Sequence, residues 1–129
     1  MRITTPMADE LERYLNLSGA ELKLTAQNMA NVDTPGYRTV GFDFEMEMKR
    51  SVRQLSAQRD ADDDAADGSL GGVEAGPVDG LLERPDGNNV SMDREGLKMA
   101  ESQLQFRTGV ELLKHEYSGI MAAIHVDQK

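Results

Sequence analysis

The sequence predicts a mainly α-helical protein whose long N-terminal and C-terminal helices pair as an antiparallel, coiled-coil-like hairpin. Apolar residues recur every three or four positions at both ends of the chain, which is the period of one helix face. The middle is rich in Asp, Gly and turn signals, so we expect it to be extended or irregular, with a candidate short hairpin. We expect five segments: an N-terminal helix with its turn (1–36), an extended and short helical segment (37–58), an acidic flexible loop (59–80), a turn or short hairpin (81–92) and a C-terminal coiled-coil helix (93–129).

The composition limits the partners and the chemistry that the chain can use. Lys and Arg number 14 against 23 Asp and Glu, and the net charge of -9 argues against nucleic acid as a partner. The chain has no Cys, which excludes disulfides and thiolate chemistry. Only 39% of the residues are hydrophobic and 5% aromatic, so we expect other chains to supply burial that a small core cannot.

Targeting signals are also missing from the sequence. Residues 1–14 contain no apolar run of the kind that a secretory signal needs, and nowhere do about 18 apolar residues follow one another. We therefore expect neither a cleaved signal peptide nor a membrane span. If the protein acts outside the cytoplasm, it leaves by another route.

The N-terminal helix should run from about Met7 to Asn31. Thr5-Pro6 suits its start, because Thr can cap a helix and Pro fits the first turn. Its apolar face repeats at alternating spacings of four and three residues. The residues of this face are Leu11, Leu15, Ser18, Leu22, Thr25 and Met29.

A turn should follow this helix directly. Asn31 tolerates the left-handed conformation that ends many helices. Pro35 disfavours helical angles at Thr34, which precedes it. Pro35-Gly36 then fits the two central positions of a type II turn, where Gly accepts a positive φ.

Two patterns compete between Val40 and Leu55. Phe42, Phe44 and Met46 alternate as in a strand, whereas Phe44 and Met48 are spaced as in a helix. We expect extended chain that passes into a short helix near Met46. The periodicity alone does not decide between the two.

The acidic segment and the turn after it differ in character. Residues 56–80 consist largely of Asp, Ala and Gly, which bury too little apolar surface to offset the entropy of ordering, so this segment should be mobile. Arg84-Pro85-Asp86-Gly87-Asn88 has strong turn chemistry and is the candidate tip of a short hairpin.

The second long helix should begin at Asp93, a favoured capping residue, and continue to about Val126. Its apolar seam repeats at the spacing of a coiled coil and consists of Phe106, Val110, Leu113, Tyr117, Ile120 and Ile124. We expect this seam to pack against Leu11, Leu15, Leu22 and Met29 of the first helix. Apolar residues outside the two stripes need cover from neighbouring subunits: Leu17, Leu24, Leu97, Ala100, Leu104 and Leu112.

No cluster in the sequence offers catalytic, cofactor or metal chemistry. A calcium-loop register that starts at Asp63 finds Ala65 where an oxygen ligand belongs. His115 and His125 are the only imidazoles, whereas a zinc site needs three or four converging ligands. The sequence therefore predicts a protein that is not an enzyme, with no catalytic residue, no metal, no cofactor and no small-molecule substrate.

Two segments resemble a known family. Gln-Asn-Met-Ala-Asn-Val-Asp-Thr-Pro-Gly-Tyr, residues 27–37, closely resembles the N-terminal signature of bacterial flagellar rod, hook and hook-associated proteins, although Asp33 stands where the family often has Asn. Residues 84–95 are similar to the segment before the C-terminal helix in proximal rod proteins of this family. The matching residues are Asn28, Ala30, Asn31, Thr34, Pro35, Gly36 and Tyr37 in the first segment and Arg84, Pro85, Asp86, Gly87 and Asn88 in the second.

The resemblance implies a structural component of the bacterial flagellum, a proximal rod subunit of the basal body that polymerises through its paired terminal helices. The implied partners are the chain itself, other rod proteins, the membrane-embedded ring and the flagellar export gate. The resemblance also implies type III export to the periplasmic rod without a cleaved signal, and a joint between inner helix and outer segment at Asn28, Asn31, Pro35, Gly36 and Tyr37. One alternative of another class stays open, a cytoplasmic helical-hairpin adaptor or export chaperone.

Overall fold

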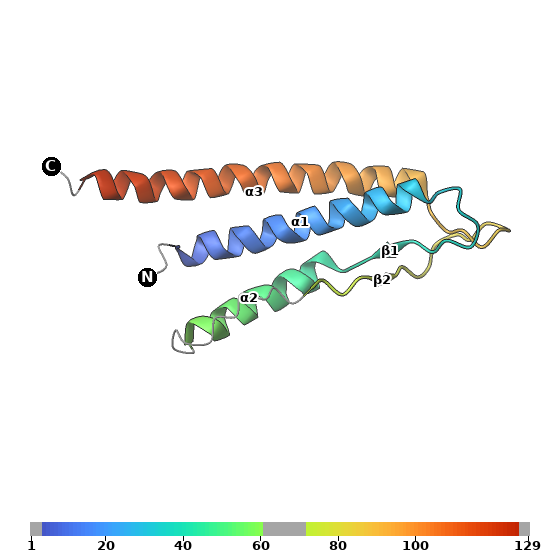
Figure 1. The fold of residues 1–129 in the computed structure, drawn as a ribbon, viewed down its shortest axis with the longest axis horizontal. Coiled ribbons are helices and arrows are strands. Elements are labelled where there is room, and N and C mark those ends of the chain that lie inside the picture. Colours follow the sequence, from blue (N-terminus) through green and yellow to red (C-terminus); the bar gives the residue numbers. More distant parts are fainter. Residues whose placement is uncertain (1–3, 61–71, 127–129) are drawn as a thin grey trace.

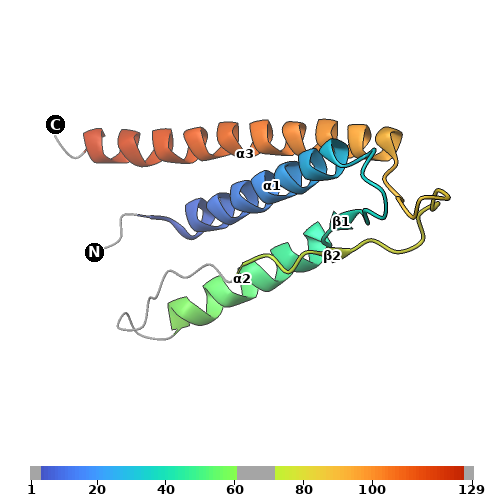
Figure 2. The ribbon, with the colours of Figure 1, turned by 45° about the vertical axis from the view of Figure 1, so that its right-hand side comes forward.

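Three helices and one very short sheet make up the fold of the described residues. The computed structural model describes residues 4–60 and 72–126. Its elements are α1 (Pro6–Ala30), β1 (Val40–Gly41), α2 (Phe44–Asp60), β2 (Gly76–Pro77) and α3 (Met92–Val126). α1 lies between the other two helices and runs antiparallel to both (Figures 1 and 2). The prediction of a mainly helical fold with paired terminal helices is confirmed.

The start of α1 and the turn after it follow the sequence closely. The Thr5 side chain accepts a hydrogen bond from the Ala8 amide at 3.1 Å, and a proline occupies the first turn. After the helix, the Tyr37 amide donates to the Thr34 carbonyl at 3.2 Å, and Gly36 has a φ of 73°. These are the bond and the positive φ of the predicted type II turn.

The end of α1 differs from the expectation in one detail. Asn31 caps the helix with a φ of -103°, which is not the left-handed conformation. Its side-chain amide instead donates to the Gln27 carbonyl at 2.8 Å. The Gln27 carbonyl also accepts from the Asn31 backbone amide at 3.2 Å, so Asn31 closes the helix end twice over without a positive φ.

The helix α2 is longer than the sequence suggested and begins earlier. It starts at Phe44 because Asp43 caps it, accepting a hydrogen bond from the Met46 amide at 3.0 Å. It reaches Asp60, so residues 56–60 are helical and do not belong to a loop. The Arg59 guanidinium holds this end against α1, since it donates to the Pro6 carbonyl at 3.0 Å.

The middle of the chain contains a two-stranded ladder at a place that the sequence did not indicate. β1 and β2 pair antiparallel, with Val40 opposite Pro77, so part of the segment expected to be mobile is paired. Residues 61–71, the rest of the acidic segment, lie outside the described residues. The expected hairpin at Arg84–Asn88 is a tight turn without flanking strands, closed by a hydrogen bond from the Arg84 amide to the Asn88 carbonyl at 2.8 Å.

The start of α3 is set by a residue other than the predicted one. Ser91, not Asp93, takes the capping position: the Glu95 amide donates to its carbonyl at 2.9 Å, and the Arg94 amide to its hydroxyl at 3.4 Å. Serine and aspartate are both good caps, so the sequence did not separate them. Across the part of the chain that the structure describes, no helix has the length and apolar character to cross a membrane.

The face of α3 that packs most closely on α1 coincides only in part with the predicted seam. On α3 the buried residues are Glu95, Ser102 and Gly109, which recur every seven positions. Phe106, Tyr117 and Ile124 of the seam are 41%, 45% and 46% exposed. The other seam residues, Val110, Leu113 and Ile120, are half-buried, as are Leu15, Leu22 and Met29 of α1, while Leu11 is buried.

A glycine explains why the helices meet on this face. A Cβ on Gly109 would lie 2.8 Å from Leu15 Cδ2 and 3.0 Å from Tyr14 Cδ1. The two side chains of α1 therefore occupy the space that a side chain at this position would fill. Small residues at the contact allow two helices to approach closely, which larger seam residues prevent.

This close approach gives a first prediction. Gly109→Leu should destabilise the protein by about 1–3 kcal/mol, because the added side chain overpacks the contact with Leu15. Gly119→Leu is the matched control on the same helix, where nothing lies within 4 Å, and should be neutral or stabilising by less than about 1 kcal/mol. Urea unfolding followed by circular dichroism measures both. Equal stability of the two variants would contradict the close contact.

Candidate functional site

The residues of the two signature segments meet at one end of the molecule. The end of α1, the turn at Thr34–Tyr37, the turn at Arg84–Asn88 and the start of α3 come together there (Figure 1). The Gly36 amide donates to the Asp86 carbonyl at 2.9 Å, which joins the two turns directly. We call this cluster the joint.

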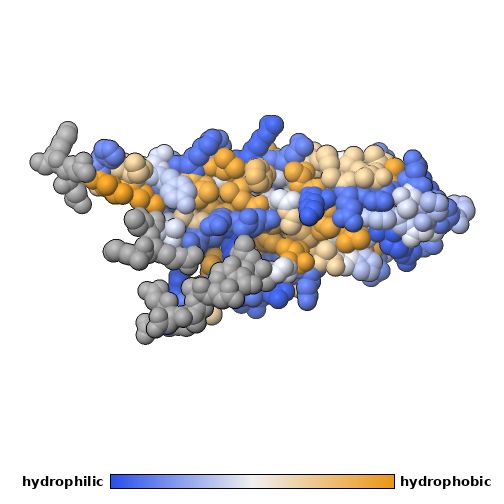
Figure 3. All heavy atoms as spheres, viewed as in Figure 1, coloured by the Kyte–Doolittle hydropathy of each residue, from blue (hydrophilic) through white to orange (hydrophobic). Residues whose placement is uncertain are grey.

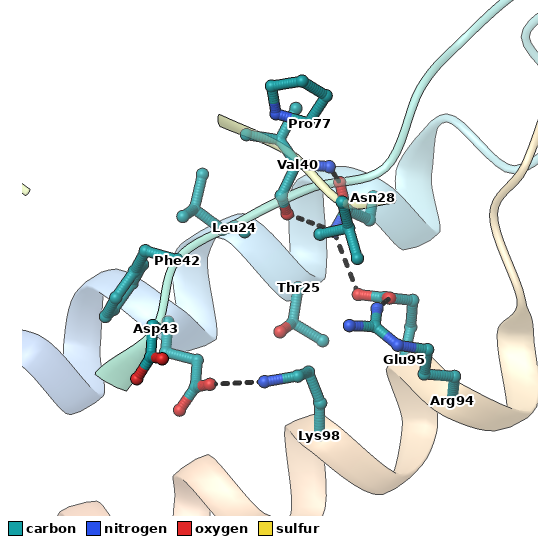
Figure 4. A pocket seen from close by; sticks show the side chains of 13 residues that line it. Leu24, Thr25, Asn28, Val40, Phe42, Asp43, Pro77, Arg94, Glu95 and Lys98 are labelled. Atoms are coloured by element: carbon teal, nitrogen blue, oxygen red, sulfur yellow. Dashed lines mark hydrogen bonds and ion pairs between the residues drawn. The ribbon is translucent and has the colours of Figure 1, made fainter. Parts of the chain in front are cut away.

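Asn28 is the centre of the joint and is only 2% exposed. Its side-chain amide donates to the Val40 carbonyl at 2.8 Å and to Glu95 Oε2 at 3.0 Å. Its side-chain oxygen accepts from the Val40 amide and from the Tyr37 hydroxyl, both at 3.0 Å. One side chain thus pairs with both backbone groups of a β1 residue and links α1 to α3 (Figure 4).

Asn88 joins the second turn to the end of α1 and to the first turn. Its side-chain amide donates to the carbonyls of Asn31 and Thr34, at 3.0 and 2.8 Å, and its oxygen accepts from the Val90 amide at 2.8 Å. Asn88 is fully buried. Buried backbone groups need such partners, because an unmade hydrogen bond costs about 1–3 kcal/mol.

Two glycines let the turns lie against each other. Gly36 and Gly87 have φ angles of 73° and 84°, which other residues rarely adopt. A Cβ on Gly87 would lie 3.4 Å from the Gly36 Cα. The backbones of the two turns therefore lie close together, and the positive φ, more than a lack of space, favours glycine at position 87.

The remaining signature residues contribute less to the joint. Arg84 donates to the Val32 carbonyl beside it. Thr34 donates from its hydroxyl to Asn31 Oδ1 at 3.1 Å, at the exposed edge of the turn. The other three signature residues, Ala30, Pro35 and Pro85, are exposed.

The sequence analysis did not identify three residues that the joint depends on. Glu95 is 1% exposed and accepts from Asn28. The Asn89 side-chain oxygen accepts from the Thr39 amide at 2.7 Å, and the Thr39 hydroxyl donates to the Asn89 carbonyl at 3.2 Å. The tandem Asn88-Asn89 was a signal for paired side-chain caps, whereas nothing near Thr39 distinguished it.

A pocket of about 330 Å³ opens beside the joint, between α1, the two strands and α3 (Figure 4). Four of its charged side chains pair with each other, Lys98 with Glu21 at 2.7 Å and Arg94 with Glu95 at 2.6 Å, while the fifth, Asp43, accepts from the Met46 amide. No unpaired charge remains on these four side chains to attract an ionic ligand. Within residues 4–60 and 72–126, no three His, Asp or Glu side chains gather as metal ligands would.

The other candidate surface is an apolar face of α3. We define the α3 strip as Phe106, Tyr117, Met121 and Ile124, which are exposed and, by helical periodicity, lie on one side of the helix. Figure 3 shows apolar atoms along α3 and at its C-terminal end. An exposed stripe of this kind on a soluble helix marks a contact surface.

The strip continues past the start of α1. The Thr5 hydroxyl, just before α1, donates to Glu116 Oε1 at 2.5 Å, so Tyr117–Val126 extends beyond this point. This end of α3 is roughly 15 Å long at 1.5 Å per residue. It contains no Asp, Glu, Lys or Arg. An uncharged helix end without a partner helix suits contact with a neighbouring chain.

A helical hairpin with a polar joint and an uncovered apolar strip defines a structural assembly subunit. No family model matches the chain. Curated proteins named flagellar basal body rod protein FlgB do match it. The protein from Salmonella typhimurium is 31% identical, with 85% of this chain and 86% of the relative covered. The Escherichia coli protein gives the same three values, and the Cereibacter sphaeroides protein is 35% identical over 78% and 80%. The chain belongs to the FlgB family of flagellar basal body rod proteins.

The central role of Asn28 is open to a direct test. Asn28→Asp keeps the shape but removes the amide donor and puts a carboxylate beside Glu95, so it should destabilise the protein by about 2–4 kcal/mol. Asn16→Asp is the control, an exposed position on the same helix, and should change stability by less than about 0.5 kcal/mol. Thermal unfolding distinguishes them, and similar midpoints would show that the joint does not depend on Asn28.

The Tyr37 hydroxyl predicts an alkaline limit of stability. Burial raises the pKa of Tyr37, Gln27 acts in the opposite direction, and the Glu95 carboxylate adds to the rise. The unfolded chain loses this proton near pH 10, so the stabilisation is complete below that pH and is lost as pH rises through the higher folded pKa. Tyr37→Phe should cost about 1 kcal/mol at neutral pH and flatten the loss of stability above pH 10. Unfolding curves at pH 8–11 measure this, and an unchanged alkaline slope would contradict it.

Proposed function

We propose that the chain is a structural subunit of the flagellar basal-body rod that polymerises with itself and with other rod proteins through the α3 strip. The observation that carries this proposal is the exposed strip on α3, on a chain whose family is that of basal body rod proteins. The finer proposal places it at the proximal end of the rod in the periplasm, between the membrane-embedded ring with its export gate and the rest of the rod. Its export would proceed through the flagellar type III pathway without a cleaved signal.

The energetics of the strip support assembly. Full burial of a Phe, Ile or Met side chain contributes about 1.5–3 kcal/mol relative to an exposed one. Phe106, Tyr117, Met121 and Ile124 each retain at least 41% exposure in the single chain. A neighbour that covers all four would add several kcal/mol to the association. Leu97 and Leu104, 72% and 68% exposed on the same helix, offer a second contact.

The joint supports the same proposal in another way. It fixes the turns and β1 to the ends of α1 and α3 through buried Asn28 and Asn88. The helix pair and the segment that contains α2 are therefore held in one arrangement, as repeated addition of identical subunits requires. This role uses the signature residues for architecture and assigns no catalytic function to them.

The strip can be tested in cells. Tyr117→Asp places a carboxylate where a neighbour should exclude water, which costs several kcal/mol and weakens association by about a hundredfold or more. Cells that carry it should not swim in soft agar, and the variant should be absent from purified basal bodies. The purified variant should keep the helicity of the parent, because Tyr117 is 45% exposed in the single chain.

Gln54→Asp is the matched control, at an exposed position of α2, and should leave swimming intact. Normal motility with Tyr117→Asp at parental protein levels would show that the strip is not an interface. If the unchanged protein stays in the soluble fraction and never sediments with basal bodies after detergent and salt washing, it is instead an adaptor or export chaperone.

A further inference from the structure

The helix α1 packs on one of the less apolar faces of α3. The buried line on α3 is Glu95, Ser102 and Gly109, none of which brings an apolar side chain to the contact. The α3 strip is far more apolar and lies on an adjacent side of the same helix. Of the strip, Phe106 lies alongside α1, whereas Tyr117, Met121 and Ile124 lie beyond its start. Hydrophobic burial alone would turn α3 so that Phe106 and the half-buried Val110 face α1. Another interaction must therefore choose the face.

Polar residues of α1 supply that interaction. Glu21 is 8% exposed, accepts from Lys98 at 2.7 Å and from the Ser102 hydroxyl at 3.2 Å. Both partners belong to the face of α3 that is turned to α1. Figure 4 shows the Lys98 side chain at the pocket, with a dashed line drawn from its amine.

Rotation of α3 would leave Glu21 without partners. Adjacent residues of a helix are about 100° apart, so bringing Val110 to the place of Gly109 carries Lys98 and Ser102 away from α1. Glu21 would then be a buried carboxylate facing apolar side chains. An unpaired buried charge is more unfavourable than the burial of a few apolar side chains is favourable.

We infer that Glu21 is a specificity-determining residue, which selects the face of α3 that α1 binds and so keeps Phe106 of the α3 strip exposed. Gly109 makes the selected face accessible, since it admits Leu15 and Tyr14. Glu21 acts by opposing every other orientation of α3 and not by adding much stability to this one. This selection is a property of the single chain and holds whether or not the strip joins a rod.

The absence of native cysteine allows a direct readout of the face. In the full-length purified chain, Leu15→Cys with Gly109→Cys reports the observed face, because the ideal Cβ at 109 lies 3.3 Å from Leu15 Cγ. Leu15→Cys with Val110→Cys reports a rotated α3. Disulfide yield under mild oxidation, quantified by mass spectrometry, gives the ratio of the two orientations.

With Glu21 unchanged, the 15–109 pair should form in large excess over the 15–110 pair. Glu21→Leu should lower that ratio at least tenfold. Glu12→Leu, an exposed glutamate on the same helix, should leave the ratio unchanged. Glu21→Lys with Lys98→Glu restores the pair in reverse and should restore the ratio.

Two results would overturn the inference. One is an unchanged ratio in Glu21→Leu, which would mean that Gly109 or the joint selects the face without help. The other is failure of the 15–109 pair to form in the chain with Glu21 intact. If Glu21→Leu does not fold, the charge-reversed double variant decides: a ratio that stays low there, in a helical protein, also overturns it.

Discussion

The structure depends on the Asn28 side chain, which makes the backbone hydrogen bonds to β1 that a neighbouring strand would otherwise make. Val40 in β1 has β2 on one side and no strand on the other, yet its amide and carbonyl both bond to the Asn28 side chain. The Asn28 side-chain amide also donates to Glu95, so the end of α1, the strand and the start of α3 are fixed together by one buried group. A two-residue ladder is too short to be stable alone. Its order comes from the helix hairpin through Asn28.

Polarity determines this fold more than apolar burial does. Among the described residues, the buried apolar ones are Ala8, Leu11, Leu17 and Val90, while the buried polar ones include Asn28, Asn88, Glu95, Ser102 and Glu21. A directional hydrogen bond specifies an arrangement, whereas an apolar contact can form in many. A chain that must keep large apolar surfaces available for neighbours can obtain a defined internal structure in this way.

The sequence predicted the features that are set locally. The cap at Thr5, the turn at Pro35-Gly36 and the length of α3 follow from residues close together in the chain. The seam on α3 was also a true helix face, but periodicity states which residues share a face and not what that face contacts. Phe106 was therefore expected to pack on α1, whereas Gly109 and Glu21 bring a neighbouring face of α3 to the contact. The ladder at Val40 joins positions far apart in the chain, and no local sequence pattern predicts it.

The free end of α3 gives the assembly a further property. From Tyr117 onward the helix extends beyond the hydrogen bond between Thr5 and Glu116, and helical stability comes mostly from packing of an apolar face, of which this end has little in the single chain. Docking of a neighbour would suppress fraying of this helix end in the single subunit. Ordering of the helix end and binding of the next subunit would then be one cooperative event. Part of the binding free energy then offsets the ordering of this helix end. Each early contact therefore stays reversible until all neighbouring subunits are in place.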